Sequence, residues 1–297
     1  MKRQIVFSLL VLLVLVSACK TQNNLGPKKQ SFIDAATPKK VKPFILKDAK
    51  SKNQKWELAF SDEFNDTKMD TTKWNVENAP KKRVDIMLYS DNNQVEEKDG
   101  KAYIYYRKSA LNDTTYMAGR FNSHKKYAPT YGFMESKIHL VKPNGYQMAF
   151  WMMPEGEGMS SKTTPDETAN DGAEIDIVEG NKLDAFSTGL HWDGYAKPAH
   201  KANGKLIKKS DLYEAEYHIF GFEWSPTLVR WYLDGKMIRE VTDPKLIPQV
   251  AHYLYFSGSC FGKSDWVDGD VRVNEFIQNG GVDKAYVDYV RVFQTIN

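Results

Sequence analysis

Three acidic residues are spaced so that they could share one face of a β-strand: Glu174, Asp176 and Glu179. Residues two apart on a strand point to the same face, so Glu174 and Asp176 lie together. Glu179 would point to the opposite face on a regular strand. A β-bulge near Ile177 and Val178 would add one residue and return Glu179 to the face of the other two. The spacing therefore predicts a bulged strand with three acids on one side and apolar residues facing the core.

Neighbouring carboxyl groups disfavour each other's ionisation, so one of the three should hold a proton near neutral pH. A carboxylate paired with a carboxylic acid is the catalytic pair typical of glycosidases, and a separation of ~5–5.5 Å between the two groups indicates a retaining mechanism. A solvated acidic strand edge or a calcium site are alternative interpretations. Apolar residues between the acids argue against a solvated edge, and calcium usually prefers loop ligands and backbone carbonyls. We expect no cofactor in catalysis, and a structural calcium is compatible with the sequence but not indicated by it.

The elements that must position these acids are strands. Apolar alternation with period two runs through 101–107, 133–140 and 286–292. Asp234-Gly235 between two such runs is typical of a hairpin turn that needs positive φ. Long amphipathic helices are missing from the pattern, so the sequence predicts an all-β antiparallel sandwich or barrel. The polar segment 154–171 is expected to be a loop over one end of a sheet.

The Glu-x-Asp-x-x-Glu pattern resembles the catalytic signature of glycoside hydrolase family 16 in its β-bulged form, the family of laminarinase- and agarase-like endo-glycanases. Further matching motifs follow in the family's order and cover nearly all of 56–297, namely Phe-Ser-Asp-Glu-Phe at 60–64, Tyr-Gly-Phe-Met-Glu-Ser-Lys-Ile at 131–138, Ala-Phe-Trp-Met at 149–152, Phe-Glu-Trp-Ser-Pro at 222–226, Trp-Tyr-Leu-Asp-Gly at 231–235 and Val-Asp-Tyr-Val-Arg-Val at 287–292. The resemblance implies a jelly-roll, concanavalin-like sandwich with a concave glycan-binding cleft. It also implies Glu174 as nucleophile, Asp176 as the residue that tunes its neighbours, and Glu179 as general acid/base.

Aromatic rings suit the flat C–H faces of sugars. Trp151 and Trp192 are our main candidates for substrate contacts, with Tyr146 and Trp266 as weaker ones and Asn75, which follows Trp74, at an edge of the cleft. His191 falls beside the acids if its strand pairs antiparallel with theirs, and similar enzymes carry a histidine near the acid/base. Arg120 resembles a residue that lines the cleft in the family. The other histidines have no partners at metal-ligand spacing, so we predict no catalytic metal.

Two departures from the β-1,3-glucanase branch leave the substrate open. That branch usually has Trp-Pro before Ala-Phe-Trp, where this chain has Gln147-Met148, and Ile-Met-Glu where this chain has Ile177-Val178-Glu179. We therefore keep β-1,3- or mixed β-glucan and β-galactan as substrates. Residues 56–297 hold 29 basic and 36 acidic residues, a net charge of −7. This charge argues against nucleic-acid binding and mildly against densely sulfated glycans.

The first residues are typical of an export signal. Lys2 and Arg3 precede an apolar run from 5 to 16, which is too short to span a bilayer. Val16-Ser17-Ala18-Cys19 resembles a bacterial lipobox, so we expect 1–18 to be a lipoprotein signal peptide and Cys19 to be lipidated. An ordinary signal peptide with an incidental cysteine is the alternative. Localisation would be the bacterial cell envelope, at the periplasmic face of the outer membrane or at the cell surface.

Residues 19–55 hold ten lysines and three prolines and are expected to form a flexible tether, with the catalytic domain at 56–297. Cys260 would then be alone in the mature chain, as a buried and inert thiol. We expect a monomeric, lipid-anchored retaining endo-β-glycanase that acts on a polysaccharide or complex glycan. A non-catalytic carbohydrate-binding lipoprotein on the same sandwich is the alternative function.

Overall fold

The computed structural model describes residues 32–45, 54–77, 81–84, 87–89, 94–110, 115–156 and 165–296, and the backbone alone at 81–84 and 87–89. The expected signal peptide and Cys19 lie outside the described residues. Within those residues, no helix is both long and apolar enough to cross a membrane.

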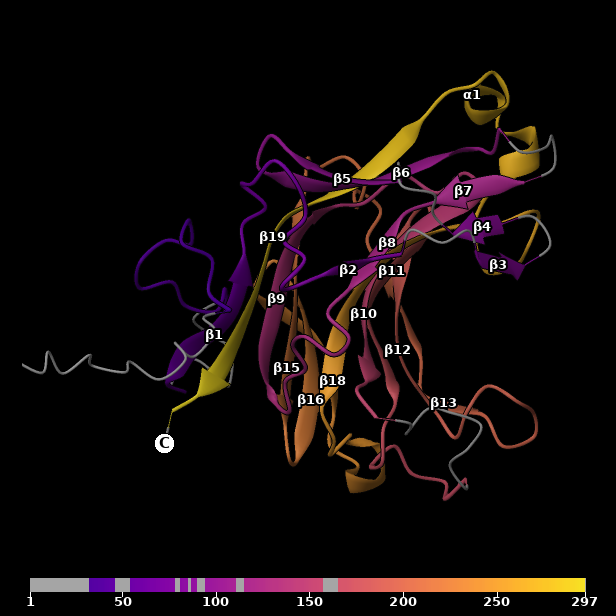
Figure 1. Ribbon diagram of the computed structural model, residues 1–297. Helices are drawn as coiled ribbons and strands as arrows, with labels where there is room; N and C mark the ends of the chain where they lie inside the picture. Colours follow the sequence, from indigo (N-terminus) through magenta and orange to yellow (C-terminus); the bar gives the residue numbers. More distant parts are fainter. Residues whose placement is uncertain are drawn as a thin grey trace, which may run out of the picture. The chain divides into compact units, whose positions relative to one another are not determined.

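The described residues from 32 onward form two β-sheets that pack face to face, as Figure 1 shows. The first sheet has eleven strands, in the order β17-β16-β15-β9-β19-β6-β7-β4-β3, with β1 also paired to β19 and β5 to β6. Its strands are β1 (Trp56–Asp62), β3 (Lys81–Val84), β4 (Met87–Tyr89), β5 (Val95–Lys98), β6 (Lys101–Lys108), β7 (Tyr116–Ala118), β9 (Gly132–His139), β15 (His218–Ser225), β16 (Leu228–Leu233), β17 (Lys236–Val241) and β19 (Asp283–Thr295). All the pairs are antiparallel except β4 with β7.

The second sheet has eight strands, in the order β13-β12-β11-β10-β18-β8-β2, with β14 also paired to β12. Its strands are β2 (Asn75–Val76), β8 (Arg120–Asn122), β10 (Tyr146–Pro154), β11 (Glu174–Lys182), β12 (Ala185–Trp192), β13 (Lys201–Ala202), β14 (Lys205–Lys208) and β18 (His252–Cys260). Short helical turns lie at η1 (Pro244–Leu246), η2 (Val271–Val273) and α1 (Glu275–Gln278). This architecture confirms the all-β antiparallel sandwich that the period-two pattern predicted.

The core lies between the two sheets and explains the alternation in the sequence. On β10, Met148, Phe150 and Met152 are fully buried in the main apolar cluster, together with Phe222 of β15 and Trp231 of β16 from the first sheet. Gln147 and Trp151 alternate with them and point to the other side of the second sheet. We call that outer side the site face.

Residues 32–45 pack against the sandwich, where we expected a flexible tether. The carbonyl of Phe32 accepts the Ser61 backbone N–H at 3.0 Å, and the Asp34 backbone N–H donates to Ser61 Oγ, also at 3.0 Å. Further along, the Phe44 backbone N–H donates to a carboxylate oxygen of Glu135 on β9 at 2.7 Å. These contacts hold the segment along the first sheet.

The reason for this packing is an apolar patch on the outer face of the first sheet. Phe133, Tyr232 and Phe293 are buried there, and Val41 and Ile45 are among the residues that cover them. Lysine and proline content predicted disorder for this stretch, but a few apolar residues with a complementary surface are enough to order it.

Candidate active site

The predicted bulge is present on β11. Across β10, Asp176 pairs with Trp151 and Glu179 with Ala149, so three steps along β11 match two steps along β10. Across β12, the same two acids pair with Gly189 and Ser187, again three steps against two. One extra residue therefore lies between Asp176 and Glu179, and it brings Glu179 back to the face of the other acids.

The residues inside the bulge turn into the core. Ile177 and Val178 are both buried in the main apolar cluster. The indole N–H of Trp231, from the opposite sheet, donates to the backbone carbonyl of Asp176 at 2.8 Å. A buried tryptophan of the first sheet thus holds the backbone of the bulged strand from below, a contact that sequence reasoning missed.

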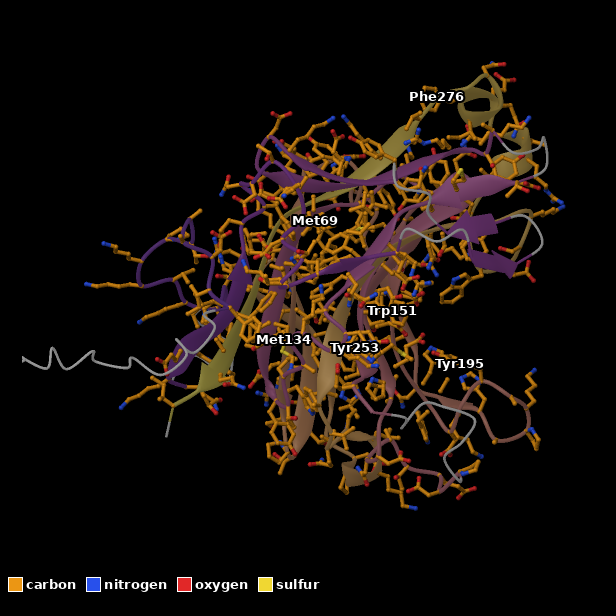
Figure 2. The ribbon with its side chains drawn as sticks, viewed as in Figure 1. Met69, Met134, Trp151, Tyr195, Tyr253 and Phe276 are labelled. Atoms are coloured by element: carbon orange, nitrogen blue, oxygen red, sulfur yellow. The ribbon has the colours of Figure 1, made fainter. Side chains whose placement is uncertain are left out.

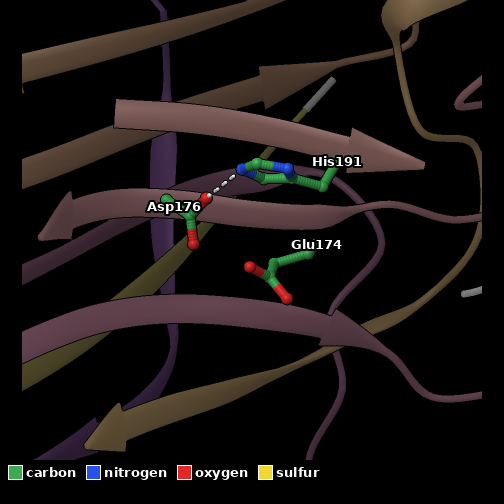
Figure 3. Close-up of side chains that lie close together, drawn as sticks. All are labelled: Glu174, Asp176 and His191. Carbon is green, nitrogen blue, oxygen red and sulfur yellow. Dashed lines mark ion pairs between the residues drawn. The ribbon is translucent and has the colours of Figure 1, made fainter. Parts of the chain in front are cut away.

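Asp176 and His191 form an ion pair on the site face. Asp176 is 2% exposed, and its Oδ2 lies 3.4 Å from Nε2 of His191 on the neighbouring strand β12. Figure 3 shows this pair, with the Glu174 carboxylate beside it. The hydrogen bond that His191 donates to Asp176 raises the pKa of His191 above its ordinary value, against the opposing effect of burial. His191 Nδ1 lies 3.1 Å from Nε2 of His200, which extends the chain of polar contacts away from the acids.

Glu174, Asp176 and His191 each offer one ligand atom within 4.8 Å of the others. Among the described residues this is the group with metal-like spacing. Two of its members are the acids that the spacing already assigned to catalysis, so their proximity follows from the shared strand face.

A tyrosine from a loop reaches the expected nucleophile. Tyr195 follows β12, its ring is exposed, and its hydroxyl donates to Oε2 of Glu174. Asp193 and Gly194 both have positive φ, so they make the turn that brings Tyr195 back toward the strand. Figure 2 labels Tyr195 on this loop, together with Trp151 of β10 and Tyr253 of β18. Sequence reasoning missed Tyr195, because a loop residue carries no strand parity.

Glu179 is bound by Gln147, whose side-chain N–H donates to Oε1 at 3.2 Å. Gln147 in turn accepts the indole N–H of Trp266 at 3.0 Å. A cavity of about 330 Å³ opens beside Glu179, and Trp266, Ser187 and Lys205 are among the residues that line it. Trp266, a weaker candidate for a substrate contact in the sequence, thus lies at the cavity beside Glu179, and its ring is exposed.

An aromatic row crosses the site face away from the acids. Trp151 stacks on Tyr255 with centroids 4.3 Å apart, and the Arg120 guanidinium lies over Tyr255 at 4.4 Å. Glu77 ties this row together, because it pairs with Arg120 at 3.1 Å and accepts the Tyr255 hydroxyl. The structure thus brings the predicted Trp151 and Arg120 together through a tyrosine that the sequence analysis did not select. Period-two alternation along 252–260 carries the signal that could have found it.

Asn75 lies at the edge of the same face. It pairs with Asn122 of β8, and its side chain donates to Asn122 Oδ1 at 3.2 Å and to the His124 carbonyl at 2.9 Å. These bonds tie the edge strand β2 to its neighbour.

Two predicted substrate contacts are wrong. Tyr146 and Trp192 both belong to the main core cluster, at 3% and 7% exposure. Tyr146 shares its face of β10 with Met148 and Phe150, and its hydroxyl donates to Asp283. Trp192 follows His191 directly, so it points to the opposite side of β12. Their aromatic rings suggested both residues as substrate contacts, but their positions on the strands direct both side chains into the core and away from the site face.

Comparisons with known proteins identify the family of this chain. The model of the family described as glycosyl hydrolases family 16 matches residues 69–274. The chain is 27% identical over 211 residues to a glucan endo-1,3-beta-glucosidase A1 of Niallia circulans, covering 63% of this chain and 29% of that protein. It is 24% identical over 271 residues to a beta-glucanase of Rhodothermus marinus, covering 84% and 89%.

Among solved structures, the laminarinase catalytic domain of Thermotoga maritima has a similar fold, with a TM-score of 0.64 and 22% identity over 82% of this chain and 100% of that one. The family match covers more than half of the chain, including the bulged strand and its three acids. The chain therefore belongs to glycosyl hydrolases family 16, and it is a glycoside hydrolase.

Proposed function

We propose that this chain is a retaining endo-β-glycanase in which Glu174 is the nucleophile and Glu179 the general acid/base. One observation carries the proposal: the bulge in β11 puts both glutamates on the site face. Glu174 and Glu179 lie on opposite sides of Asp176, and each is two positions away from it when counted along the partner strand β12. Two carboxyl groups that flank a scissile bond are what glycoside hydrolysis needs.

In the first step, Glu174 attacks the anomeric carbon while Glu179 gives its proton to the glycosidic oxygen. The bond from the anomeric carbon to the leaving oxygen breaks, and a covalent glycosyl-enzyme forms. Tyr195 donates to Glu174, which holds this carboxylate in place before attack.

In the second step, Glu179 takes a proton from water, and the water oxygen attacks the anomeric carbon and releases Glu174. Asp176 lies between the two glutamates and pairs with His191, and this contact raises the pKa of that histidine. When His191 is protonated, its charge offsets the repulsion between the neighbouring carboxylates.

Two observations support the proposed substrate class: the aromatic row and the names of the sequence relatives. Trp151 and Arg120 are partly exposed and offer a ring and a guanidinium group to a sugar, while the buried Tyr255 packs against both and holds them in place. The two sequence relatives are named as β-glucanases, so β-1,3- or mixed-linkage β-glucan is the first substrate to test. At Gln147 and Val178 the chain differs from the β-1,3-glucanase pattern, so β-galactan is the second substrate to test.

The test is digestion of laminarin, mixed-linkage β-glucan and agarose, with product sizes by chromatography and product anomers by NMR. We expect internal cleavage of one glycan and retention of the β configuration. Glu174→Gln and Glu179→Gln should each lose at least about 10³-fold in turnover. Glu57→Gln, on an exposed position of β1, is the matched control and should be fully active. An inverted product would refute the roles, and glycan binding without cleavage would favour the binding-protein alternative.

We further propose that Cys19 anchors the protein to a membrane of the cell envelope. The support is the lipobox-like Val16-Ser17-Ala18-Cys19 and the preceding apolar run. Cys19→Ala should move the full-length protein from the membrane to the soluble fraction, with unchanged turnover. Retention of the variant on membranes would refute the anchor.

A further inference from the structure

Gln147 connects the acid/base to an exposed tryptophan. It lies on β10 and is only 6% exposed. Its amide oxygen accepts the Trp266 indole N–H at 3.0 Å, and its amide nitrogen donates to Glu179 Oε1 at 3.2 Å. Both ends of a buried side chain are therefore committed, one to the candidate acid and one to an aromatic ring of the neighbouring cavity.

The indole fixes the orientation of this amide. An indole nitrogen can only donate, so the oxygen of Gln147 must face Trp266 and the NH₂ group must face Glu179. An N–H donated to a carboxyl oxygen favours the ionised form of that group. Glu179 becomes a carboxylate when it gives up its proton, so this bond becomes stronger as the glycosidic bond breaks.

We propose that Gln147 is a positioning residue that holds Glu179 for proton transfer and fixes Trp266 as the platform for the leaving-group side of the glycan. This inference rests on the proposed function. The cavity of about 330 Å³ beside Glu179 lies in the size range of small-ligand sites. Trp266, 43% exposed, offers an apolar ring there, and Ser187 and Lys205 offer polar groups. These residues suit a neutral sugar unit, stacked on the ring and bound through its hydroxyls.

The glutamine at position 147 distinguishes this chain from the β-1,3-glucanase pattern. Gln147-Met148 stands where the β-1,3-glucanase pattern has Trp-Pro, and neither of those residues has a side-chain amide. Binding of the leaving unit against Trp266 would act on the acid through the indole, the amide and the carboxyl group in turn.

Substitution of Gln147 tests the proton-transfer role. Gln147→Met keeps the volume and removes both hydrogen bonds. On an oligosaccharide, kcat should fall about 10- to 100-fold, because proton donation is poorly aligned. On a 2,4-dinitrophenyl glycoside of the same sugar, kcat for glycosylation should fall less than about 3-fold, because this leaving group needs little protonation. Gln294→Met, at an exposed position of β19, is the matched control.

The pH profile supplies a second readout. Without the donated N–H, Glu179 should keep its proton to higher pH, so the alkaline limb of kcat/KM should move upward in Gln147→Met. The charged or titratable groups around Glu179 and its cavity include Glu174, Asp176 and Lys182 of β11, His191 of β12, Lys205 of β14 and Asp265, and the substitution changes none of them.

Substitution of Trp266 separates the platform from the hydrogen bond. Trp266→Phe keeps a ring but loses the indole N–H, so kcat on the oligosaccharide should fall about 3- to 10-fold with KM within about 2-fold of the wild type. Trp266→Ala should also raise KM by about 10-fold, since stacking of a sugar on an aromatic ring contributes substantially to binding.

Equal slowing of Gln147→Met on both substrates would overturn the proposal, because it would indicate a merely structural residue. Wild-type turnover on the oligosaccharide would overturn it as well. A measurement that does not depend on hydrolysis is the NMR signal of the ¹⁵N-labelled indole of Trp266, which should follow the titration of Glu179 in the wild type and stop doing so in Gln147→Met. If the wild type cleaved no glycan but the indole still followed this titration, the proposed function would fail and the coupling would stand; an indole insensitive to pH would refute the coupling itself.

Discussion

Gly189 leaves the space in which the Asp176–His191 pair sits, and Gly189→Ala is the most direct perturbation of that pair. Gly189 is opposite Asp176 in the β11–β12 ladder. A Cβ at this position would lie 2.6 Å from Asp176 Oδ2 and 3.2 Å from His191 Nε2. Ordinary contact begins near 3.4 Å, so the Asp176 carboxylate has to move by about 0.8 Å.

Two opposing effects decide whether Gly189→Ala raises or lowers the free energy of unfolding. Alanine is favoured over glycine inside a strand by about 0.5–1 kcal/mol. Crowding of a buried carboxylate that has little room to move costs about 1–3 kcal/mol, so the clash should win and the free energy of unfolding should fall by about 1–2 kcal/mol. The effect on turnover should be larger, because a displacement near 1 Å in a catalytic group can cost about 10²-fold.

Three measurements check this prediction. Urea unfolding gives the stability change, and turnover on the cleaved glycan gives the change in kcat. NMR titration of His191 is the direct readout: separation from Asp176 should lower its pKa, since the hydrogen bond with Asp176 is the main cause of the upward shift. Gly156→Ala is the control, because a Cβ there meets nothing within 4 Å.

A Gly189→Ala protein with wild-type kcat and an unchanged His191 titration would contradict this prediction. Such a protein would show that the pair tolerates the added methyl group or that catalysis does not depend on it. A loss of activity with an unchanged His191 titration would place the defect elsewhere on the strand.

Three further predictions concern stability. Burial raises the pKa of Glu135 from 4.5 to about 7, so between these pH values the folded state holds a proton that the unfolded state has lost, and the free energy of unfolding should fall as pH rises. In Glu135→Gln, the amide oxygen can still accept the Phe44 N–H, but the titrating group is gone. Urea unfolding at pH 5 and at pH 8 should therefore show a difference in unfolding free energy that is smaller than in the wild type by up to about 3 kcal/mol. Trp231→Phe removes the hydrogen bond to the Asp176 carbonyl and should cost about 2–4 kcal/mol in urea unfolding and more than 10-fold in kcat, whereas an unchanged kcat would show that the bulge holds without it. Phe32→Ala should cost about 2–4 kcal/mol if the N-terminal segment is a folded part of the domain, and a change below about 0.5 kcal/mol would contradict that packing.

Local patterns in the sequence were enough for the sheet and for the core of the site. Alternation with period two predicted the strands because strands such as β9 and β10 turn one face toward the core. The Asp234-Gly235 turn has the positive φ values that its residues favour. The spacing of Glu174, Asp176 and Glu179 predicted the bulge because strand parity is a property of the chain itself, independent of which strands lie beside it.

Contacts between distant segments could not be predicted in the same way. The sequence placed Tyr146 and Trp192 in the cleft by their ring type, but the register of β10 and β12 decides which side faces the core. Residues 32–45 looked disordered by composition, and only the apolar outer face of the first sheet shows why they are ordered.

The finest features of the site depend entirely on tertiary structure. Gln147 and Trp266 are 119 positions apart, and Trp231 reaches the Asp176 carbonyl from the opposite sheet, across 55 positions. The residue types at 174–179 were enough to predict which acids share one face of the strand, because strand parity acts within a few residues. The packing of the two sheets and the loops decided how those acids are oriented. A hydrogen bond needs its two atoms within about 3 Å of each other, and only the folded chain brings these distant residues that close.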